Sequence, residues 1–454
     1  MLHRVLIANR GEIAVRIVRA CHRLGIEAVL AASEADLESL PARLADRTVC
    51  LGPAAPAGSY LDTGAVLAAA RQVAADAIHP GYGFLSENPG LARACEAAGL
   101  AFIGPAASVL DAAGDKLAAR DHAAAAGLPV LPGGEARNLA GAQRVAEQAG
   151  WPVLVKAVGG GGGRGLRQVH HPRDLATAIG VAMAEAQAAF GDPRIYLERF
   201  VSGGRHVEVQ LLGDGSEVIG LGDRDCSVQR RYQKLIEEAP APGLADGLRS
   251  ALGEAAVALG RRLGYRGLGT VEFLLDPGLG EFYFLEVNAR IQVEHPVTEA
   301  VTGLDLVAEQ LRLADGGALR LAPGDVTQSG HAIECRINAE DWRHGFRPSP
   351  GTVTRAVFPA GPGIRVDTWV QAGTVVPPYY DSLLAKLVTS GPDRASALDL
   401  LRRALAACDI GGVTTNLPLH TALTGEPEFA ASAVDTGYLE RFLARDANEA
   451  ALHG

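Results

Sequence analysis

The sequence has no apolar run long enough to cross a bilayer, although 48% of its 454 residues are hydrophobic. Its first residues, "MLHRVLIANRGEIAVRIV", contain neither a small-residue cleavage site nor a Ser/Arg-rich stretch, so we expect no targeting signal. These absences predict a cytoplasmic protein without a membrane partner. A chain of this length has room for about two to four domains of ordinary size.

Cysteines are few and widely separated, and positive charge is not in excess. The six cysteines form no C-x-x-C pair, so their spacing predicts reduced thiols and neither a zinc site nor a disulfide framework. The formal net charge is -10, whereas nucleic acids and anionic membranes bind basic surfaces. We therefore expect no nucleic-acid partner, and an anionic ligand would need a local basic pocket.

The dinucleotide-binding motif is absent as well. Through the first hundred residues, short apolar strands alternate with helix-like stretches, which is typical of a parallel α/β sheet. The first strand-to-helix turn reads "ANRGEIA" where a dinucleotide site would have G-x-G-x-x-G. This difference argues against nicotinamide chemistry.

A break near residues 128–134 separates this region from a second one. The second region contains a strand, a glycine loop and a strand, then a helical pattern at about 174–189 and a hairpin at "GTVEFLLDPGLGEFYFLEVN". A third region begins at about residue 330 with "HAIECRINAED" and ends in helices. The chain shows no internal repeat and no low-complexity segment.

The segment "KAVGGGGGRG", residues 156–165, places five glycines between a lysine and an arginine. A glycine run alone is equally typical of a flexible linker. Here strand-like "PVLVK" and "GLRQV" flank the run and predict a hairpin tip, where glycine lets backbone N–H groups approach an anion. The loop does not end in the G-K-[ST] of a Walker A motif. It therefore predicts a phosphate-covering flap of another type, with Lys156 as a phosphate ligand.

Two glutamates of the predicted hairpin, Glu272 and Glu286, face each other if residues 277–281 form its loop. Like charges directly opposite destabilise a sheet. The pattern therefore implies either a different register or a cation between the two carboxylates, for which Mg²⁺ is the natural candidate.

Polar residues continue at every second position beyond this glutamate pair. Asn288, Arg290, Gln292 and Glu294 share one parity, and the residues between them are apolar. An extended chain here would bury its apolar face and present the polar row, which has the composition of an active site. The alternative is an amphipathic edge strand with a solvated polar face.

With these residues in view, the chain resembles the biotin carboxylases, members of the ATP-grasp superfamily. The matching segments run from about residue 5 to about residue 415: "ANRGEIA", "HPGYGFLSEN", "GDK", "VKAVGGGGGRG", "RHVEVQ", "RDCSVQRRYQK", "EEAPAP", "GTVEF", "FLEVNARIQVEHPVTE", "ECRINAED", "PSPG" and "VPPYYDSLLAKL". Together they are very specific, although the glycine loop alone is not. The resemblance implies a mixed α/β and α+β fold: a Rossmann-like N-terminal domain (1–114), an ATP-grasp domain (115–320) with a lid at about 128–201, and a C-terminal α+β domain (330–446).

The resemblance also implies roles for individual residues. The ATP-binding residues are Lys116, Lys156, Gly161, Gly162, Gly163, Glu198, Val201, His206, Gln229 and Tyr232. The residues for Mg²⁺ or Mn²⁺ are Glu272, Glu286 and Asn288. The residues for bicarbonate and biotin are Lys234, Arg290, Gln292, Val293, Glu294, Arg336 and Tyr82. The catalytic residues among these are Lys234, Arg290, Glu294 and Arg336.

The implied reaction is the ATP- and bicarbonate-dependent carboxylation of biotin through carboxyphosphate. Glu294 would take the proton from bicarbonate, which attacks the γ-phosphoryl group of ATP. Carboxyphosphate would release CO₂ and a phosphate that deprotonates the ureido nitrogen of biotin. Arg336 would then stabilise the enolate-like oxygen of the ring.

The resemblance further implies protein partners. In the family, biotin is attached to a lysine of a Met-Lys-Met motif in a carrier domain, and neither Met1 nor Met183 lies beside a lysine. Only residues 416–454 follow the matched segments, and domains rarely fall below ~50 residues. We therefore expect a separate biotin carboxyl carrier protein and a separate carboxyltransferase, as in acetyl-CoA carboxylase of fatty acid biosynthesis or a related enzyme. Similarity to the family also implies a homodimer.

Three positions depart from the family's pattern, and two other functions stay open. The departures are Val158, Arg199 and Tyr232. Val158 removes a hydroxyl near the flap, and Tyr232 changes a nucleotide contact. One alternative is an ATP-grasp ligase that activates a different carboxylate. The other is an ATP-binding subunit without catalysis, which would be expected to have lost some of the catalytic and metal residues.

Overall fold

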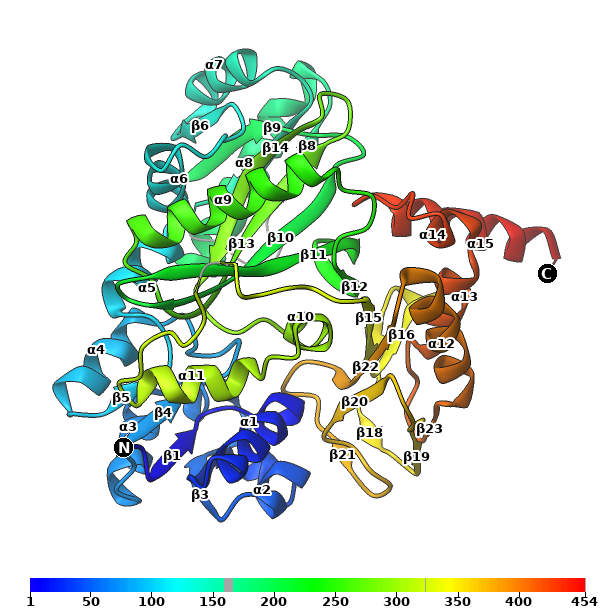
Figure 1. Ribbon diagram of the computed structural model, residues 1–454. Helices are drawn as coiled ribbons and strands as arrows, with labels where there is room; N and C mark the ends of the chain where they lie inside the picture. The colour runs from blue at the N-terminus through cyan, green and yellow to red at the C-terminus, as the bar shows by residue number, and fades with distance from the viewer. Residues whose placement is uncertain (159–165, 323, 454) are drawn as a thin grey trace.

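The computed structural model describes residues 1–158, 166–322 and 324–453, so the glycine loop at 159–165 lies outside the described residues. The N-terminal part is a five-stranded sheet with the order β3-β2-β1-β4-β5, and all its strands are parallel (Figure 1). Its strands are β1 (Arg4–Ile7), β2 (Glu27–Ser33), β3 (Arg47–Gly52), β4 (Ala77–His79) and β5 (Ala101–Phe102). Its helices are α1 (Gly11–Arg23), α2 (Leu40–Leu44), α3 (Thr63–Gln72) and α4 (Pro89–Ala97). The predicted parallel α/β sheet is confirmed.

Two helices, α5 (Ala107–Gly114) and α6 (Lys116–Ala125), lead out of this sheet. The Asp115 carboxylate accepts hydrogen bonds from the backbone N–H groups of Leu117 and Ala118, so it caps the N-terminus of α6. This cap places Lys116 on the first turn of α6.

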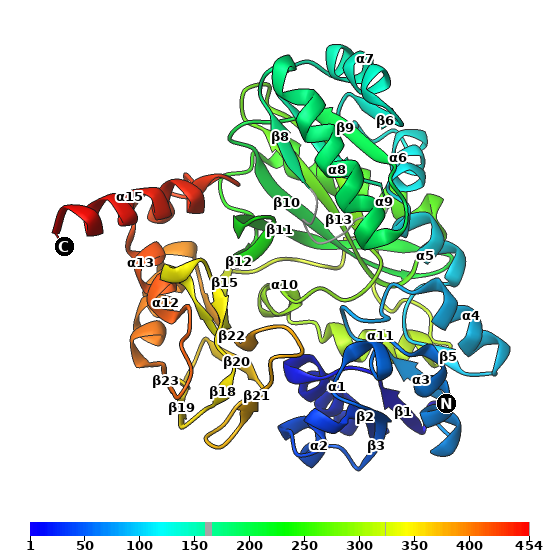
Figure 2. The same cartoon turned by 180° about the vertical axis from the view of Figure 1, so that it is seen from behind.

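A small antiparallel sheet with the order β6-β9-β7-β8 forms a separate lobe, seen at the top of Figure 2. Its elements are β6 (Gly133–Ala136), α7 (Leu139–Ala149), β7 (Val153–Ala157), β8 (Arg167–Val169), α8 (Leu175–Phe190) and β9 (Ile195–Arg199). Alternate residues of β7 and β9 pack against α7 and α8, as expected for a sheet with one covered face. Because β7 and β8 pair antiparallel, the segments that flank the glycine loop form the predicted hairpin.

The largest element is an eight-stranded antiparallel sheet with the order β14-β13-β10-β11-β12-β15-β22-β20. Its strands are β10 (Arg205–Asp214), β11 (Val218–Arg230), β12 (Gln233–Ala239), β13 (Arg266–Asp276), β14 (Glu281–Asn288), β15 (His331–Asn338), β20 (Ile364–Thr368) and β22 (Leu383–Gly391). The helices between them are α9 (Asp246–Arg262), α10 (His295–Thr302) and α11 (Leu306–Ala314). Pairing of β12 with β15 joins the second and third regions into one sheet.

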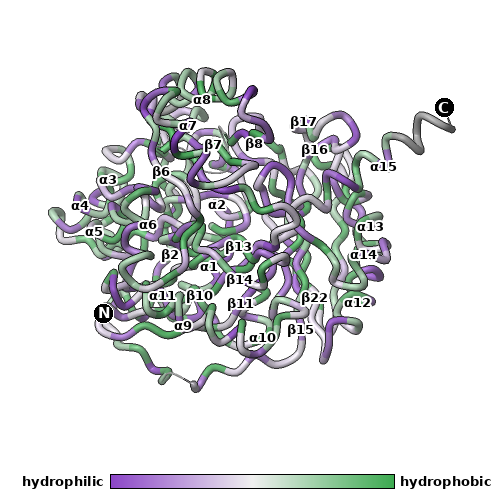
Figure 3. Tube along the Cα trace, turned by 90° about the horizontal axis from the view of Figure 1, so that it is seen from above, coloured by the Kyte–Doolittle hydropathy of each residue, from purple (hydrophilic) through white to green (hydrophobic). Residues whose placement is uncertain are grey.

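The C-terminal part covers one face of this sheet. Its helices are α12 (Arg394–Ala407), α13 (Leu417–Gly425), α14 (Pro427–Ala430) and α15 (Tyr438–His453). Helices α12, α13 and α14 lie together on the side of the molecule where β22 lies (Figure 3). Three short ladders complete it: β16 (Glu340–Asp341) with β17 (Arg347–Pro348), β18 (Gly351–Thr352) with β21 (Val375–Val376), and β19 (Arg355–Val357) with β23 (Asp409–Gly411). Cys335 and Ile337 of β15 pack in the core with α12, so Glu334 and Arg336 point to the opposite face.

None of the helices in the described ranges has both the length and the apolar character needed to cross a membrane. All six cysteines are free thiols, and five of them are buried. The prediction from their spacing, which excluded a disulfide framework, is therefore confirmed.

Candidate active site

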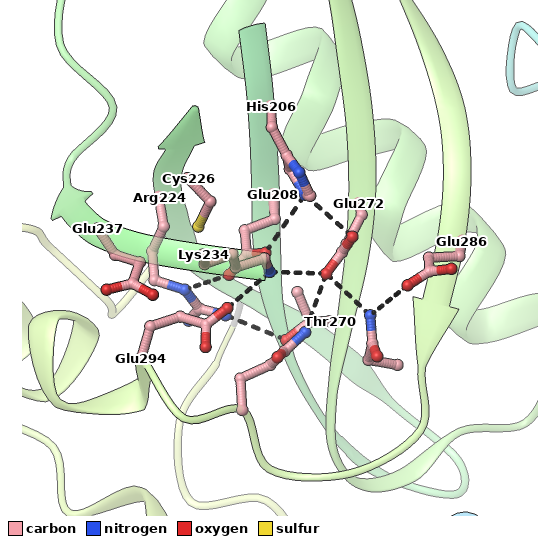
Figure 4. Close-up of polar contacts among 12 residues, drawn as sticks. His206, Glu208, Arg224, Cys226, Lys234, Glu237, Thr270, Glu272, Glu286 and Glu294 are labelled. Atoms are coloured by element: carbon pink, nitrogen blue, oxygen red, sulfur yellow. Dashed lines mark hydrogen bonds and ion pairs between the residues drawn. The ribbon is translucent and has the colours of Figure 1, made fainter. Parts of the chain in front are cut away.

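The ammonium group of Lys234 lies among three buried carboxylates. Its Nζ donates to Glu208 at 2.5 Å and to Glu272 and Glu294 at 2.7 Å each (Figure 4). The lysine comes from β12 and the glutamates come from β10, β13 and the N-terminus of α10, so the strand order creates the cluster. Burial lowers the pKa of a lysine, but the three carboxylates hold the pKa of Lys234 well above its usual value. Lys234 is therefore a fixed positive charge at the centre of the site.

Glu294 connects this lysine to an arginine. Its Oε1 accepts from Lys234, and its Oε2 accepts from Arg336 Nη2 at 2.8 Å. Burial raises the pKa of Glu294, but the two cations outweigh it and hold that pKa well below its usual value. Glu237 accepts a further bond at 2.5 Å from Arg336 Nε and fixes the guanidinium. Glu294 is thus an ionised carboxylate held between two predicted substrate ligands.

Glu272 on β13 lies directly opposite Glu286 on β14, as the sequence predicts. The predicted loop is wrong by one residue, because β14 already begins at Glu281 and only residues 277–280 lie outside the strands. A bulge beside Glu272 makes Leu285 an extra residue of β14 and restores the pairing of the two glutamates. The pairing is confirmed even though the loop boundary is not.

The two opposed glutamates have different surroundings. The groups that contact Glu272 within 3.1 Å are Lys234, His206, Asn288 and Gln292. Among the described contacts, Glu286 accepts only a 3.4 Å bond from Asn288 Nδ2. Burial, followed by the charge of Glu272, raises the pKa of Glu286. A carboxylate with so few donors beside a second carboxylate is a place where a divalent cation is stabilised.

The two carboxylates fit Mg²⁺ or Mn²⁺, which prefer oxygen ligands. Asn288 directs its amide nitrogen toward the glutamates and its oxygen toward Arg290, so its amide would have to turn over to bind a metal. A second cluster consists of His206, Glu208 and Glu272, whose ligand atoms lie within 4.8 Å of one another. In that cluster, however, the Lys234 ammonium already contacts both carboxylates. The pair of Glu272 and Glu286 is therefore the better candidate for a metal.

The polar row beyond Glu286 converges on this cluster, although it is not a strand. Arg290 Nη2 donates to Asn288 Oδ1 at 2.9 Å, and Gln292 Nε2 donates to Glu272 Oε1 at 3.1 Å. The predicted extension through Glu294 is wrong, because β14 ends at Asn288 and the chain then turns into α10. The solvated-edge alternative does not hold either, since Asn288, Gln292 and Glu294 are buried.

Two lysines act on Glu286 through their charges: Lys116 on α6 and Lys156 on β7 of the small lobe. Lys156 of β7 pairs with Glu198 of β9 at 2.5 Å. Burial and then the charge of Lys156 lower the pKa of Lys116, while Glu286 and Glu198 oppose this shift. Two ammonium groups that repel each other beside carboxylates are suited to a bound phosphate chain. The flap residues Gly161, Gly162 and Gly163 lie outside the described residues.

The other predicted nucleotide residues are less uniform. Val201 is buried in an apolar cluster with Leu131 and Tyr283. His206 on β10 lies 2.9 Å from Glu272 and 3.4 Å from Gln229.

Tyr232 lies at the turn between β11 and β12, with a positive φ of 67° and 40% of its surface exposed. Burial raises the pKa of Tyr232, and the charges of Lys156 and Glu198 also act on it. The structure therefore groups His206 with Gln229, and it brings Tyr232 within range of the charges of Lys156 and Glu198.

Of the other two departures, Val158 is buried, and the Arg199 guanidinium lies 3.3 Å from Asp276 and over the ring of Tyr283. The Arg199 side chain is thus engaged with the protein.

Tyr82 lies on the N-terminal side of the site. Its hydroxyl donates to Glu12 Oε1 at 2.5 Å, and it lines a cavity of about 270 Å³ together with Arg10, Phe84 and Asp381. Burial and the charge of Glu12 raise the pKa of Tyr82 well above its usual value, so the phenol stays protonated. This cavity is bounded by both the first and the third regions of the chain.

Several charged residues of the site were not predicted. Glu208 pairs with Arg224 Nε at 2.6 Å as well as with Lys234, and all exposed surface is lost from both side chains. Glu87 lies 3.2 Å from Arg290 Nε. Glu208 follows His206 by two residues on a predicted strand, so its position on the same face was a usable signal. The position of Glu87 gives no such signal.

Comparison with known families covers nearly the whole chain. Residues 1–110 match the family described as "Biotin carboxylase, N-terminal domain", and residues 334–441 match "Biotin carboxylase C-terminal domain". Residues 115–322 match "Carbamoyl-phosphate synthase L chain, ATP binding domain".

Individual proteins are similar over their full length. The biotin carboxylase of Pseudomonas aeruginosa is 49% identical over 450 residues, which cover 98% of this chain and 100% of that protein. The biotin carboxylase of Nostoc sp. is 48% identical over 440 residues, which cover 96% of this chain and 98% of that protein. Among solved structures, the biotin carboxylase domain dimer of the Hydrogenobacter thermophilus 2-oxoglutarate carboxylase, in complex with MgADP, ADP and bicarbonate, superposes with a TM-score of 0.94. That domain is 43% identical in sequence, and the superposition covers 97% of this chain and 98% of the H. thermophilus domain.

Proposed function

The chain belongs to the biotin carboxylase family, and from this membership we propose how its residues carry out the ATP- and bicarbonate-dependent carboxylation of biotin. One observation carries the assignment of the site. A single ionised carboxylate, Glu294, bridges the lysine assigned to bicarbonate and the arginine assigned to biotin. Neither an ATP-grasp ligase for another carboxylate nor a non-catalytic subunit needs that bridge.

In the first step Glu294 acts as the general base. Lys234 and Arg290 hold bicarbonate, and Glu294 accepts its proton because neighbouring cations keep the carboxylate ionised. The oxygen that loses the proton attacks the γ-phosphorus of ATP, the bond to the β-phosphate oxygen breaks, and carboxyphosphate and ADP form. Gln292 and the backbone at Val293 complete the bicarbonate pocket.

The phosphate chain is held by the two lysines that meet near Glu286. Lys116 and Lys156 contact the phosphates, while Glu198, Val201, His206 and Gln229 contact the rest of the nucleotide. Glu272, Glu286 and Asn288 would hold Mg²⁺ or Mn²⁺, which supplies positive charge to the transferring phosphoryl group. Tyr232 is proposed as a further nucleotide contact, because the charges of Lys156 and Glu198 act on its phenol.

In the second step Arg336 stabilises the ureido oxygen of biotin. Carboxyphosphate breaks down to CO₂ and phosphate, the phosphate takes the ureido N–H proton, and the nitrogen then attacks CO₂. Negative charge develops on the ring oxygen, where the planar guanidinium of Arg336 is fixed by Glu237. Tyr82 borders the cavity through which biotin enters.

We further propose that biotin arrives on a separate carrier protein and that a separate carboxyltransferase uses the product. Matched relatives that are biotin carboxylases along their whole length support this arrangement. The H. thermophilus domain forms a dimer, and we propose a homodimer here. The free cysteines agree with a reducing compartment, so we place the protein in the cytoplasm.

The proposal is tested by ADP formation from MgATP in a coupled assay. We expect ADP to appear only with bicarbonate, and faster when free biotin is added. Acetate, formate or carbamate in place of bicarbonate serve as controls for a different acyl-phosphate ligase. ADP formation that follows one of these carboxylates and ignores bicarbonate would overturn the proposal, and ATP binding without ADP formation would favour a non-catalytic subunit.

A further inference from the structure

The chain contains only four lysines, namely Lys116, Lys156, Lys234 and Lys386, because almost all its basic residues are arginines. Three of them belong to the candidate active site. The fourth, Lys386 on β22, has a side chain with no exposed surface at all. Nearly every other cation of the chain is an arginine. The lysine at this position therefore indicates that the site requires a compact ammonium and does not accommodate the larger guanidinium.

The ammonium of Lys386 contacts all three regions of the chain. Its Nζ donates to the backbone carbonyl of Val293 at 2.8 Å and lies 3.0 Å from Glu12 Oε1. On the sheet, Lys386 lies directly opposite Arg336 of β15 on one side and Asp367 of β20 on the other. Glu12 belongs to the first region, Val293 to the second and Lys386 to the third. One charge therefore joins the parts that together enclose the site.

Stability alone does not explain this charge. A buried ion pair gains little over an apolar residue of the same volume, because both charges lose their hydration. A methionine on β22 together with an apolar residue at position 12 would fill the same space without that loss. Lys386 also lies directly opposite another cation, Arg336, which is unfavourable in a sheet.

The first contact of Lys386 leads to the bicarbonate pocket. The Val293 carbonyl belongs to the peptide group that joins Val293 to Glu294, and Glu294 is the residue that precedes α10. Holding this carbonyl fixes the peptide plane, and with it the direction in which the Glu294 side chain leaves the backbone. The carboxylate that bridges Lys234 and Arg336 therefore has its backbone held by Lys386.

The second contact leads to the biotin side. Glu12 lies in the first turn of α1, and its Oε1 accepts from both Lys386 and the Tyr82 hydroxyl, the latter at 2.5 Å. With Lys386 removed, Glu12 would be a buried carboxylate without a cation, and it would not remain in place as an ionised acceptor. The orientation of Tyr82 at the cavity thus depends on the same ammonium.

We propose that Lys386 is a positioning residue for both substrates, which orients the Val293–Glu294 peptide for bicarbonate and the Glu12–Tyr82 pair for biotin. The inference rests on the proposed function. A role in folding alone would affect all three substrates equally. A positioning role affects bicarbonate and biotin but leaves KM for ATP unchanged, because the residues assigned to ATP have no contact with Lys386 among the described residues.

The test compares Lys386→Arg and Lys386→Met with the parent chain. We expect both variants to raise KM for bicarbonate and KM for biotin by about tenfold, the effect of losing a hydrogen bond to a charged group. KM for ATP should stay within about twofold. The control is Arg402→Lys, an exchange on α12, where the guanidinium bonds the Thr424 carbonyl and the Asp399 carboxylate and contacts none of Val293, Glu12 and Asp367. It should leave all three KM values unchanged.

A further variant separates the two contacts. Tyr82→Phe removes the hydroxyl that Glu12 holds and should raise KM for biotin several-fold while KM for bicarbonate stays unchanged. If Lys386→Met does not fold, Lys386→Arg and Tyr82→Phe still decide the matter. Unchanged KM values for bicarbonate and biotin in Lys386→Arg would overturn the inference, as would an equal rise for ATP. A parent chain without bicarbonate-dependent ADP formation would instead overturn the proposed function.

Discussion

Glu272 and Glu286 lie directly opposite each other on β13 and β14, yet among the described residues cationic side chains contact Glu272 and not Glu286. Lys234 and His206 contact Glu272, whereas the described contacts of Glu286 contain one long bond from an amide. Two facing carboxylates repel each other, and a bound cation removes this repulsion. The asymmetry makes Glu286 the residue whose charge is most directly linked to metal binding.

We therefore expect Glu286→Gln to raise the Mg²⁺ concentration needed for half-maximal ADP formation by about tenfold or more. The substitution removes a ligand charge but also relieves repulsion of Glu272, so the free energy of unfolding should stay the same or rise. Titration of activity with Mg²⁺ and urea unfolding without metal measure the two effects. An unchanged Mg²⁺ requirement would show that Glu286 does not bind the metal.

Glu272→Gln is the matched comparison, because it makes the same chemical change on the opposite strand. This variant leaves Lys234 and His206 without one of their acceptors in a buried cluster. We expect it to lower the free energy of unfolding by about 1 to 3 kcal/mol, the usual effect of leaving buried partners unpaired. Equal stability of the two variants would contradict the asymmetry.

The hairpin shows how far sequence alone reaches. Alternation of polar and apolar residues predicts that Glu272 faces Glu286, and the structure confirms this pairing. The bulge at Leu285 could not be predicted, because neither glycine nor any other turn residue marks it. The loop is one residue shorter than predicted, and the bulge adds one residue to β14. These two shifts cancel, so Glu272 still pairs with Glu286.

The rest of the site depends on which strands become neighbours. Lys234 and Arg336 lie on β12 and β15, and pairing of these strands joins segments about 90 residues apart. Loop closure of that length leaves no local signal. Glu208, Glu237 and Lys386 enter the site only through that order. The row through Glu294 was predicted as a strand because its alternation continues, whereas the turn into α10 overrides it.

Glu294→Gln is expected to reduce bicarbonate-dependent ADP formation by ~10²-fold or more, the usual loss for a missing general base. Binding of ATP should change little, because Glu294 reaches the residues assigned to the nucleotide and metal only through Lys234, which also contacts Glu272. Calorimetric titration with a non-hydrolysable ATP analogue measures binding separately from turnover. A variant that turns over like the parent would remove Glu294 from the mechanism.

Glu237 gives a prediction for pH. Burial raises its pKa to about 7, against ~4.3 for an unfolded chain. Between these values the folded protein holds a proton that the unfolded chain has released, so the contribution of Glu237 to stability is lost as pH rises through this window. Glu237→Gln does not titrate, and its free energy of unfolding should fall less than that of the parent between about pH 5 and about pH 7.5. Urea unfolding at several pH values measures the two slopes.

The control for this slope is Glu217→Gln, because the Glu217 side chain is 63% exposed and pairs only loosely with Arg261. Its pH dependence should match that of the parent. The prediction for Glu237 fails if the parent and Glu237→Gln lose stability in parallel over the same pH range.

The lysines give the last prediction, which concerns where biotin is attached. Biotin is carried on the side chain of an accessible lysine, and this chain has only four lysines, none of them exposed and none beside a methionine. We expect the purified 454-residue chain, produced together with a biotin protein ligase, to show its unmodified mass and to give no signal with streptavidin. A biotinylated carrier protein produced under the same conditions is the positive control, and it should become carboxylated when this chain, MgATP and bicarbonate are added. Covalent biotin on any of the four lysines would contradict the separate-carrier proposal and would also place that lysine at the surface.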